Sequence, residues 1–176
     1  ETNYSRAAVG GVGAAKAAGN YAASLLPAKK AQEEGYDQLI WTDAKNHNYL
    51  EESGTMNLML VKGKTLLTPP LEGKTILPGI TRKSILQLAQ DWDYEVIERP
   101  ISVTELVEGI EDGSISELFG VGTAATIAPI SVAGYEEKQL KLSDCTKWEF
   151  STKVKQYLED LKTGKVKDTH NWIETL

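Results

Sequence analysis

Short apolar segments of two kinds alternate along this chain, and this alternation limits the fold more than any other feature of the sequence. Residues 38–42 (QLIWT), 57–61 (NLMLV) and 65–68 (TLLT) are short, apolar and bounded by turn residues, as buried strands are. Residues 81–92 instead carry apolar side chains with the period of a helix that has one buried face. Strands and helices are therefore intermixed without an internal repeat, and the sequence predicts an α/β fold.

Turn residues predict how the first elements are joined. Residues 62–64 (KGK) are expected to form the turn of a hairpin between two of the apolar segments. A helix over residues 20–35 is expected to end at Gly35. Pro27 lies inside this helix, so it either kinks the helix or divides it into two shorter ones.

Capping residues locate the later helices. Thr81 is a suitable N-cap for the helix that follows it, and Ser102 with Glu105 forms a capping box for the next one. The remaining expected elements are a strand over 94–102, a glycine turn leading into a strand over 117–130, and a final amphipathic helix around 154–161.

The composition is typical of a single globular domain and excludes several classes of function. The net charge of the 176 residues is −6, and no basic patch with interleaved aromatic residues is found, so no nucleic acid partner is expected. No apolar run approaches the ~20 residues of a membrane helix, so no membrane partner is expected. Cys145 is the only cysteine, which suits a cytoplasmic location, and His47 and His170 lie far apart, so no metal site is expected.

One lysine stands apart from every other charge. No charged residue lies within nine positions of Lys16, and its neighbours are almost all small or apolar. Ala15 and Ala17 exclude a P-loop, and Lys16 itself fills the third glycine position of a dinucleotide fingerprint. An amine that loses water among apolar residues can condense with an aldehyde; the alternative is a lysine whose head group reaches solvent from a tight turn.

The start of the helix over residues 81–92 is a candidate anion site. Arg82 and Lys83 lie in its first turn, where the helix dipole disfavours each positive charge by ~0.3–1 kcal/mol. A phosphate held by the backbone amides of Ile80 and Thr81 would reverse this effect. The alternative is an ordinary solvated basic turn after a Pro-Gly bend.

Two further turns contain glycine beside polar side chains. Residues 120–126 (GVGTAAT) include the hydroxyl of Thr123, and residues 51–57 (EESGTMN) begin with two carboxylates. Either turn taken alone is a weak signal, because turns contain Gly, Ser and Thr for steric reasons.

Four ordered segments carry a family pattern: AVGGVGAAKAAGNYAASLLP, YLEESGTMNLMLV, TPPLEGKTILPGITRKSILQLA and ELFGVGTAATIAPI. Together they resemble branched-chain amino acid aminotransferases, which are fold-type IV enzymes that use pyridoxal 5′-phosphate. The match follows the family order over nearly the whole chain. The resemblance implies a mixed sheet partly closed into a pseudo-barrel with surrounding helices, as in the large domain of the D-amino acid aminotransferase-like fold.

The resemblance also implies roles for residues near the cofactor ring. Lys16 matches the lysine that binds the cofactor aldehyde covalently and later acts as the base in proton transfer. Tyr21 matches the tyrosine that hydrogen-bonds the phenolic oxygen, although a core aromatic residue is the alternative. Glu52 matches the glutamate that keeps the pyridine nitrogen protonated, whereas Glu51 is interpreted as solvated.

Other matching positions surround the phosphate and the substrate. The amides of Ile80 and Thr81 and the hydroxyl of Thr123 match groups that hold the phosphate. Thr55 and the amide of Ala124 match groups near the substrate carboxylate.

Two departures from the family pattern are visible. Ala125 and Ala128 replace a Cys-x-x-Cys pair of mammalian members, so thiol regulation is not expected. The reactive lysine lies near the middle of family enzymes but is residue 16 here. Residues 1–176 are therefore expected to be the cofactor-binding large domain, without the smaller N-terminal domain that supplies a phosphate-binding arginine and part of the substrate pocket.

The resemblance implies transamination between Leu, Ile or Val and 2-oxoglutarate by a homodimer of the intact enzyme, with this chain inactive alone. A D-amino acid transaminase or an aminodeoxychorismate lyase shares the same lysine and glutamate, although SGTMN and TPPLEGKTILPG favour the branched-chain group. A different class also fits: a non-catalytic domain that uses the same turns to bind a phosphorylated ligand or a partner chain.

Overall fold

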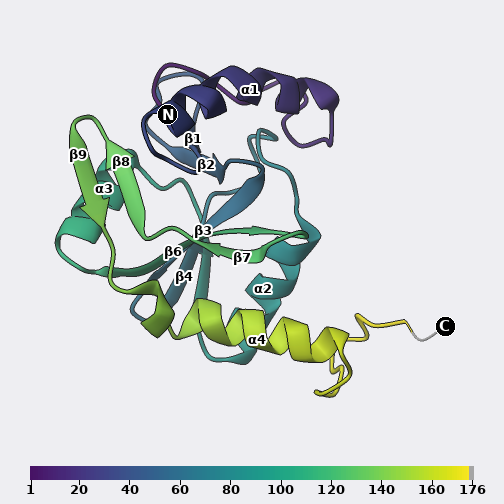
Figure 1. The fold of residues 1–176 in the computed structure, drawn as a ribbon. Helices are drawn as coiled ribbons and strands as arrows, with labels where there is room; N and C mark the ends of the chain where they lie inside the picture. The colour runs from purple at the N-terminus through teal and green to yellow at the C-terminus, as the bar shows by residue number, and fades with distance from the viewer. Residues whose placement is uncertain (175–176) are drawn as a thin grey trace.

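The computed structural model describes residues 1–174, which form a mixed α/β fold (Figure 1). A seven-stranded sheet and a separate two-stranded hairpin are surrounded by four α-helices within this range. In chain order the elements are α1 (Ala18–Glu33), β1 (Ile40–Thr42), β2 (Leu50–Ser53), β3 (Met56–Lys62), β4 (Thr65–Thr68), α2 (Ile80–Asp91), β5 (Glu95–Glu98), α3 (Val103–Glu111), β6 (Ile115–Gly122), β7 (Thr126–Pro129), β8 (Val132–Tyr135), β9 (Lys138–Lys141), the 3₁₀ helix η1 (Cys145–Lys147) and α4 (Phe150–Lys162).

Strand β3 is the centre of the large sheet. It pairs with β6 along one edge, and on its other edge it pairs first with β2 and then with β4. The sheet therefore forks, with β1 and β2 on one branch and β4 and β5 on the other. Because side chains alternate along a strand, Leu58 and Leu60 enter one core cluster while Met59 and Val61 enter another.

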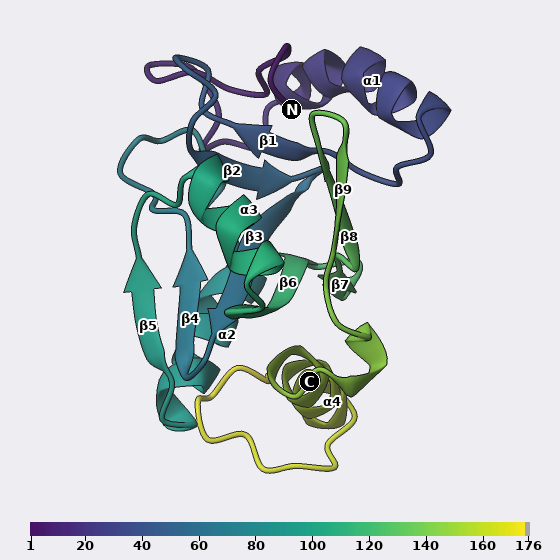
Figure 2. The same ribbon diagram turned by 90° about the vertical axis from the view of Figure 1, so that its left-hand side faces the viewer.

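Each face of the sheet has its own cover. Helix α3 and the β8–β9 hairpin contribute to the cluster that contains Leu58, and α2 and α4 contribute to the cluster that contains Met59. In Figure 2, α3 lies in front of β3 and α4 lies at the far end from α1. The apolar period over residues 81–92 is confirmed, since Ile85, Leu88 and Ala89 are fully buried.

The mixed sheet is confirmed, but the strands described in residues 1–174 do not close a barrel. Strands β4 and β5 form a parallel pair joined through α2, whereas the other pairs are antiparallel. A single bridge between Tyr49 and Ser102 brings the chain after β5 back to the start of β2. In the described part of the chain, this bridge is the only strand-type pairing between the two branches of the sheet.

Several predicted element boundaries are confirmed. Helix α1 runs unbroken through Pro27 and ends at Glu33, and Gly35 follows its C-cap Glu34 with a φ of 90°, the left-handed conformation expected of a glycine just after a helix. The side chain of Ser102 caps α3 by accepting a hydrogen bond from the amide of Glu105. Thr81, however, is not an N-cap: α2 begins at Ile80, and its N-cap is Gly79, which has no side chain to donate or accept.

Three strands were not expected. β2 includes both glutamates of the EESGTMN segment, which was interpreted as a turn, and β8 and β9 form a hairpin with little apolar alternation. Residues 117–122 belong to strand β6 rather than to a glycine turn. Short strands with polar residues carry little local signal, because their pairing partners supply most of their stability.

Helix α1 lies over the end of the sheet formed by β1 and β2, at the opposite end from α4 in both views (Figures 1 and 2). No helix in residues 1–174 has the length and apolar character needed to cross a membrane. The segment before α1 passes the same end of the sheet. The polar residues of the candidate active site, described below, lie at this end.

Candidate active site

A pocket lies between α1, the segment that precedes it, and the turn joining β2 to β3. Three residues expected at the site, Tyr21, Glu52 and Thr55, line this pocket together. The other lining residues are Arg6, Ala15, Asn20, Ser24, Gly54 and Leu77.

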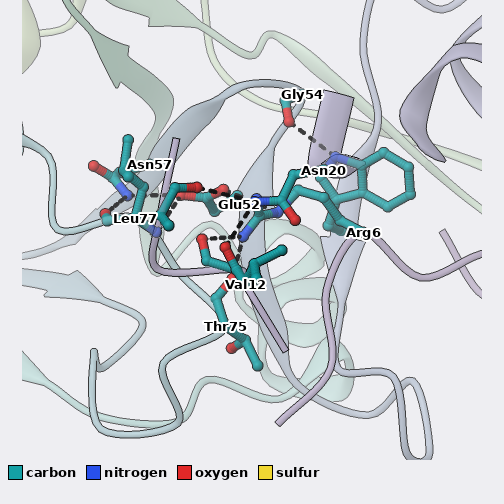
Figure 3. A network of polar contacts seen from close by, with 11 residues as sticks. Arg6, Val12, Asn20, Glu52, Gly54, Asn57, Thr75 and Leu77 are labelled. Carbon is teal, nitrogen blue, oxygen red and sulfur yellow. Dashed lines mark hydrogen bonds and ion pairs between the residues drawn. The ribbon is translucent and has the colours of Figure 1, made fainter. Parts of the chain in front are cut away.

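Glu52 is the buried acid of this pocket. The residue is 3% exposed, and its Oε1 accepts hydrogen bonds from Asn57 Nδ2 at 2.9 Å and from the amide of Leu77 at 3.2 Å (Figure 3). Strand pairing sets this arrangement, because Glu52 lies directly opposite Asn57 in the β2–β3 ladder. Burial raises the pKa of Glu52 to about 7, against the lowering effects of Arg6 and these hydrogen bonds.

Arg6 is a site residue that the sequence reasoning missed. Its Nε lies 3.0 Å from Glu52 Oε2 as an ion pair without hydrogen-bond alignment, and its side chain is 8% exposed. Its Nη2 donates to the carbonyls of Gly13 and Thr75. The available signal was that Arg6 is the only basic residue before Lys16.

The turn that carries Lys16 borders the same pocket. Asn20, at the start of α1, donates hydrogen bonds to the carbonyls of Val12 at 2.9 Å and Ala15 at 3.0 Å, which fixes the turn on the helix. Ala15 lines the pocket beside Glu52. The lysine and the acid therefore lie at the same end of the molecule.

Lys16 itself is exposed, and the expectation that it is buried among small residues is wrong for this chain. The turn lies on the surface, and its apolar neighbours Val9 and Val12 are exposed as well. Apolar residues adjacent in sequence do not bury a side chain unless other elements pack over them.

Ile80 and Thr81 begin α2, as the anion-site interpretation requires. The first amides of a helix have no partner within it, and the cap residue Gly79 supplies none. Ile80 is exposed and borders a groove beside α2 rather than the Glu52 pocket. Asn57 connects the two places, because its Nδ2 donates both to Glu52 and to the carbonyl of Leu77.

Arg82 pairs with a carboxylate of the protein and does not point to the open amides at the start of α2, which corrects the interpretation of the basic helix start. Its side chain is 4% exposed and turns back into the protein, where Nη2 lies 2.6 Å from Glu98 Oε2 and 3.0 Å from the carbonyl of Pro69. It ties α2 to β5 and to the chain after β4. Lys83 remains exposed.

Thr123 and Ala124 lie in the exposed turn between β6 and β7. They do not line the Glu52 pocket. Pairing of Val121 with Asn57 places this turn beside the start of β3, at the end of the sheet that holds Glu52.

Glu51 is buried, so its interpretation as a solvated neighbour is wrong. It is 6% exposed, its Oε2 has no hydrogen-bond partner among the described residues, and burial raises its pKa. The reason is that β2 is covered on both faces, with all four of its residues buried, so side-chain alternation does not bring Glu51 to solvent.

Comparison with known proteins identifies the family. Residues 4–133 match the family described as Amino-transferase class IV, and the chain belongs to this family. It is 44% identical over 177 residues to a branched-chain-amino-acid aminotransferase of Mycolicibacterium smegmatis, covering 98% of this chain and 48% of the relative. The chain thus spans about half the length of the curated relatives it matches.

Solved structures of the same kind share the fold. The branched-chain amino acid aminotransferase from Escherichia coli aligns with a TM-score of 0.80 and 33% identity, over 99% of this chain and 55% of that one. A T.th. branched-chain amino acid aminotransferase, solved with pyridoxamine 5′-phosphate, aligns with a TM-score of 0.81 and 25% identity, over 98% of this chain and 53% of that one.

Proposed function

We propose that this chain is the pyridoxal 5′-phosphate-binding part of an enzyme that transaminates branched-chain L-amino acids, Leu, Ile and Val, with 2-oxoglutarate. The observation that carries the proposal is the buried carboxylate of Glu52, which shares a pocket with Tyr21 and Thr55 beside the turn of Lys16. Family membership and the names of the relatives support it.

The residues present fit this cofactor. A buried carboxylate that pairs with an arginine suits a protonated pyridine nitrogen, and the open amides at the start of α2 suit a phosphate. When bound, the cofactor supplies an electron sink that stabilises negative charge at the substrate's alpha carbon.

Each of the proposed site residues near the cofactor ring then has a distinct role. The amine of Lys16 would hold the cofactor covalently and, when free of it, would move the proton at the alpha carbon. Glu52 would hold a proton on the ring nitrogen, and the hydroxyl of Tyr21 would donate a hydrogen bond to the phenolic oxygen.

The remaining proposed site residues bind anionic groups. The phosphate would be held by the amides of Ile80 and Thr81 and by the Thr123 hydroxyl, and the substrate carboxylate by Thr55 and the amide of Ala124.

The proposal extends to parts outside this chain. We propose that the intact protein has a further, smaller N-terminal domain and is a homodimer, and that this chain alone lacks turnover. Two observations support this proposal: Lys16 is exposed, and the chain covers only about half of the length of its relatives. The alternatives within the fold, a D-amino acid transaminase or an aminodeoxychorismate lyase, would be separated by the keto acids that the intact protein accepts.

The deciding experiment traps the cofactor on the lysine. The chain is incubated with pyridoxal 5′-phosphate and its visible absorption and intact mass are measured before and after borohydride. We expect a visible band and a borohydride-fixed mass increase that Lys16→Ala abolishes. Lys29→Ala, which removes an exposed lysine of α1, is the matched control and should leave both signals in place. A chain that takes up no cofactor, or that is labelled equally after Lys16→Ala, contradicts the assignment and favours the non-catalytic binding domain.

A further inference from the structure

We infer that Arg6 is a positioning residue of this site: it keeps Oε2 of Glu52 as the charged acceptor that faces the cofactor ring, and it fastens the Lys16 turn to that acid. This inference rests on the proposed function, because it assigns a role toward the proposed cofactor. The contacts of one buried guanidinium group carry it (Figure 3).

The two oxygens of Glu52 differ in what they can still accept. Oε1 already accepts from Asn57 Nδ2 and from the amide of Leu77, which uses both of its lone-pair directions. Oε2 faces Arg6 alone among the described residues, at 3.0 Å and without hydrogen-bond alignment. Acceptor capacity therefore remains on Oε2, and a ring nitrogen that donates to Glu52 would donate there.

Arg6 is also what opposes neutralisation of this acid. Among the residues described, the charged groups that act on Glu52 are Arg6, from the segment before α1, and Glu51, from the same strand. Burial and Glu51 both favour the neutral acid, while Arg6 favours the carboxylate. Without Arg6 the acid would be protonated over a wider pH range and would no longer stabilise a proton on the ring.

The same side chain reaches the lysine turn. Nη2 donates to the carbonyl of Gly13, three residues before Lys16, at 3.4 Å, and also to the carbonyl of Thr75. Gly13 permits this approach, because a Cβ at that position would overlap Thr75. A planar guanidinium can bind the acid and these carbonyls at once, whereas a lysine ammonium is a single point of charge.

The test measures Glu52 in the cofactor-free chain, so it does not depend on whether pyridoxal phosphate binds. The chain is labelled with ¹³C-glutamate, and the titration midpoint of Glu52 is followed by NMR in the wild type, Arg6→Met and Arg6→Lys. Exchange of the Ala15 amide, which donates to Val12 within the turn, is measured in the same samples. Arg82→Met removes another ion-paired arginine, whose side chain is 4% exposed against 8% for Arg6, and is the matched control.

We expect Arg6→Met to raise the Glu52 midpoint by at least about one pH unit, while Arg6→Lys stays within about half a unit of the wild type. Both Arg6 variants should exchange the Ala15 amide faster, and Arg82→Met should change neither quantity. If Arg6→Met does not fold, Arg6→Gln takes its place in the same comparison. An unmoved midpoint in the neutral variant, or equal shifts in the neutral and lysine variants, overturns the inference even if borohydride trapping supports the proposed function.

Discussion

Glu52 shows how a single residue can be unfavourable for folding and suited to chemistry. Its carboxyl group is removed from water inside strand β2, and burial is the largest influence on its pKa. A surface glutamate would be ionised without cost, but water would then compete for any cofactor nitrogen beside it. The hydrogen bonds from Asn57 and Leu77 and the charge of Arg6 offset part of the cost of burial.

This burial predicts a pH dependence of stability. The pKa of Glu52 rises from an ordinary 4.5 to about 7 in the folded chain, so between these values the folded state binds more protons than the unfolded state. The stability that Glu52 contributes is complete below pH 4.5 and is lost as the pH rises through 7. We expect Glu52→Gln to remove this loss, which is on the order of 3 kcal/mol.

Urea unfolding of the cofactor-free chain at pH 5 and pH 7.5 measures the effect. The stability difference between the two conditions should shrink in Glu52→Gln and stay unchanged in Glu72→Gln, which alters an exposed acid. If stability changed equally between pH 5 and pH 7.5 in the wild type and in Glu52→Gln, burial would not raise the pKa of this acid.

At the scale of elements, the β2–β3 ladder and the start of α2 act as one unit. Asn57 on β3 binds Glu52 on β2 and also the carbonyl of Leu77, two residues before Gly79. The proposed contact to the cofactor ring and the proposed phosphate site are thereby held in a fixed relation by one amide side chain. The tight packing of Gly79 against Asn57 makes this relation testable.

Replacing Gly79 with alanine should disturb both places at once. The backbone φ of −67° suits any residue, but the added Cβ would overlap Asn57 Oδ1 and displace the amide from Glu52 and Leu77. We expect Gly79→Ala to lower the free energy of unfolding by ~1–3 kcal/mol and to weaken pyridoxal phosphate binding by about tenfold or more. Urea unfolding and a fluorescence binding titration measure the two effects.

Gly73→Ala is the control, because a Cβ there meets only Thr75 Oγ1 at 3.6 Å, an ordinary contact. It should change neither stability nor binding appreciably. Unchanged binding in Gly79→Ala would separate the phosphate site from the Glu52 network.

At the scale of the whole molecule, helix α1 and the turn before it expose several large apolar side chains. Val9, Val12, Leu25 and Leu26 are each more than half exposed, on α1 and the turn before it. Exposed apolar side chains such as these are available for packing by further protein or ligand. Val9 and Val12 lie in the turn that carries Lys16, which fits our proposal that residues outside this chain complete the substrate pocket.

We therefore expect cofactor binding without efficient turnover by the 176-residue chain. With leucine and 2-oxoglutarate, its rate should be at least ~100-fold below that of the intact protein, because incomplete positioning of the substrate alone costs this much. A coupled assay of glutamate formation compares the two. Leucine turnover by the chain at a rate near that of the intact protein would refute the proposal that residues outside this chain are needed for turnover.

Local signals in the sequence determined the elements that depend on neighbouring residues. Caps at Ser102 and Gly35, the apolar period of α2 and the hairpin between β3 and β4 act over a few residues, so they are visible without a structure. The family motifs also predicted that Glu52, Tyr21 and Thr55 belong to one site, and in the structure these three residues line one pocket.

Tertiary structure alone decided how the charges are arranged. Arg6 meets Glu52 across 46 positions of sequence, Arg82 turns inward to Glu98, Glu51 is covered on both faces of its strand, and Lys16 stays exposed. Each outcome depends on which distant element packs against a side chain, and desolvation and ion pairing are set by that packing rather than by the neighbouring residues. The sequence by itself thus determined which residues form the local elements, and only the folded chain determined which of its charges are buried and paired.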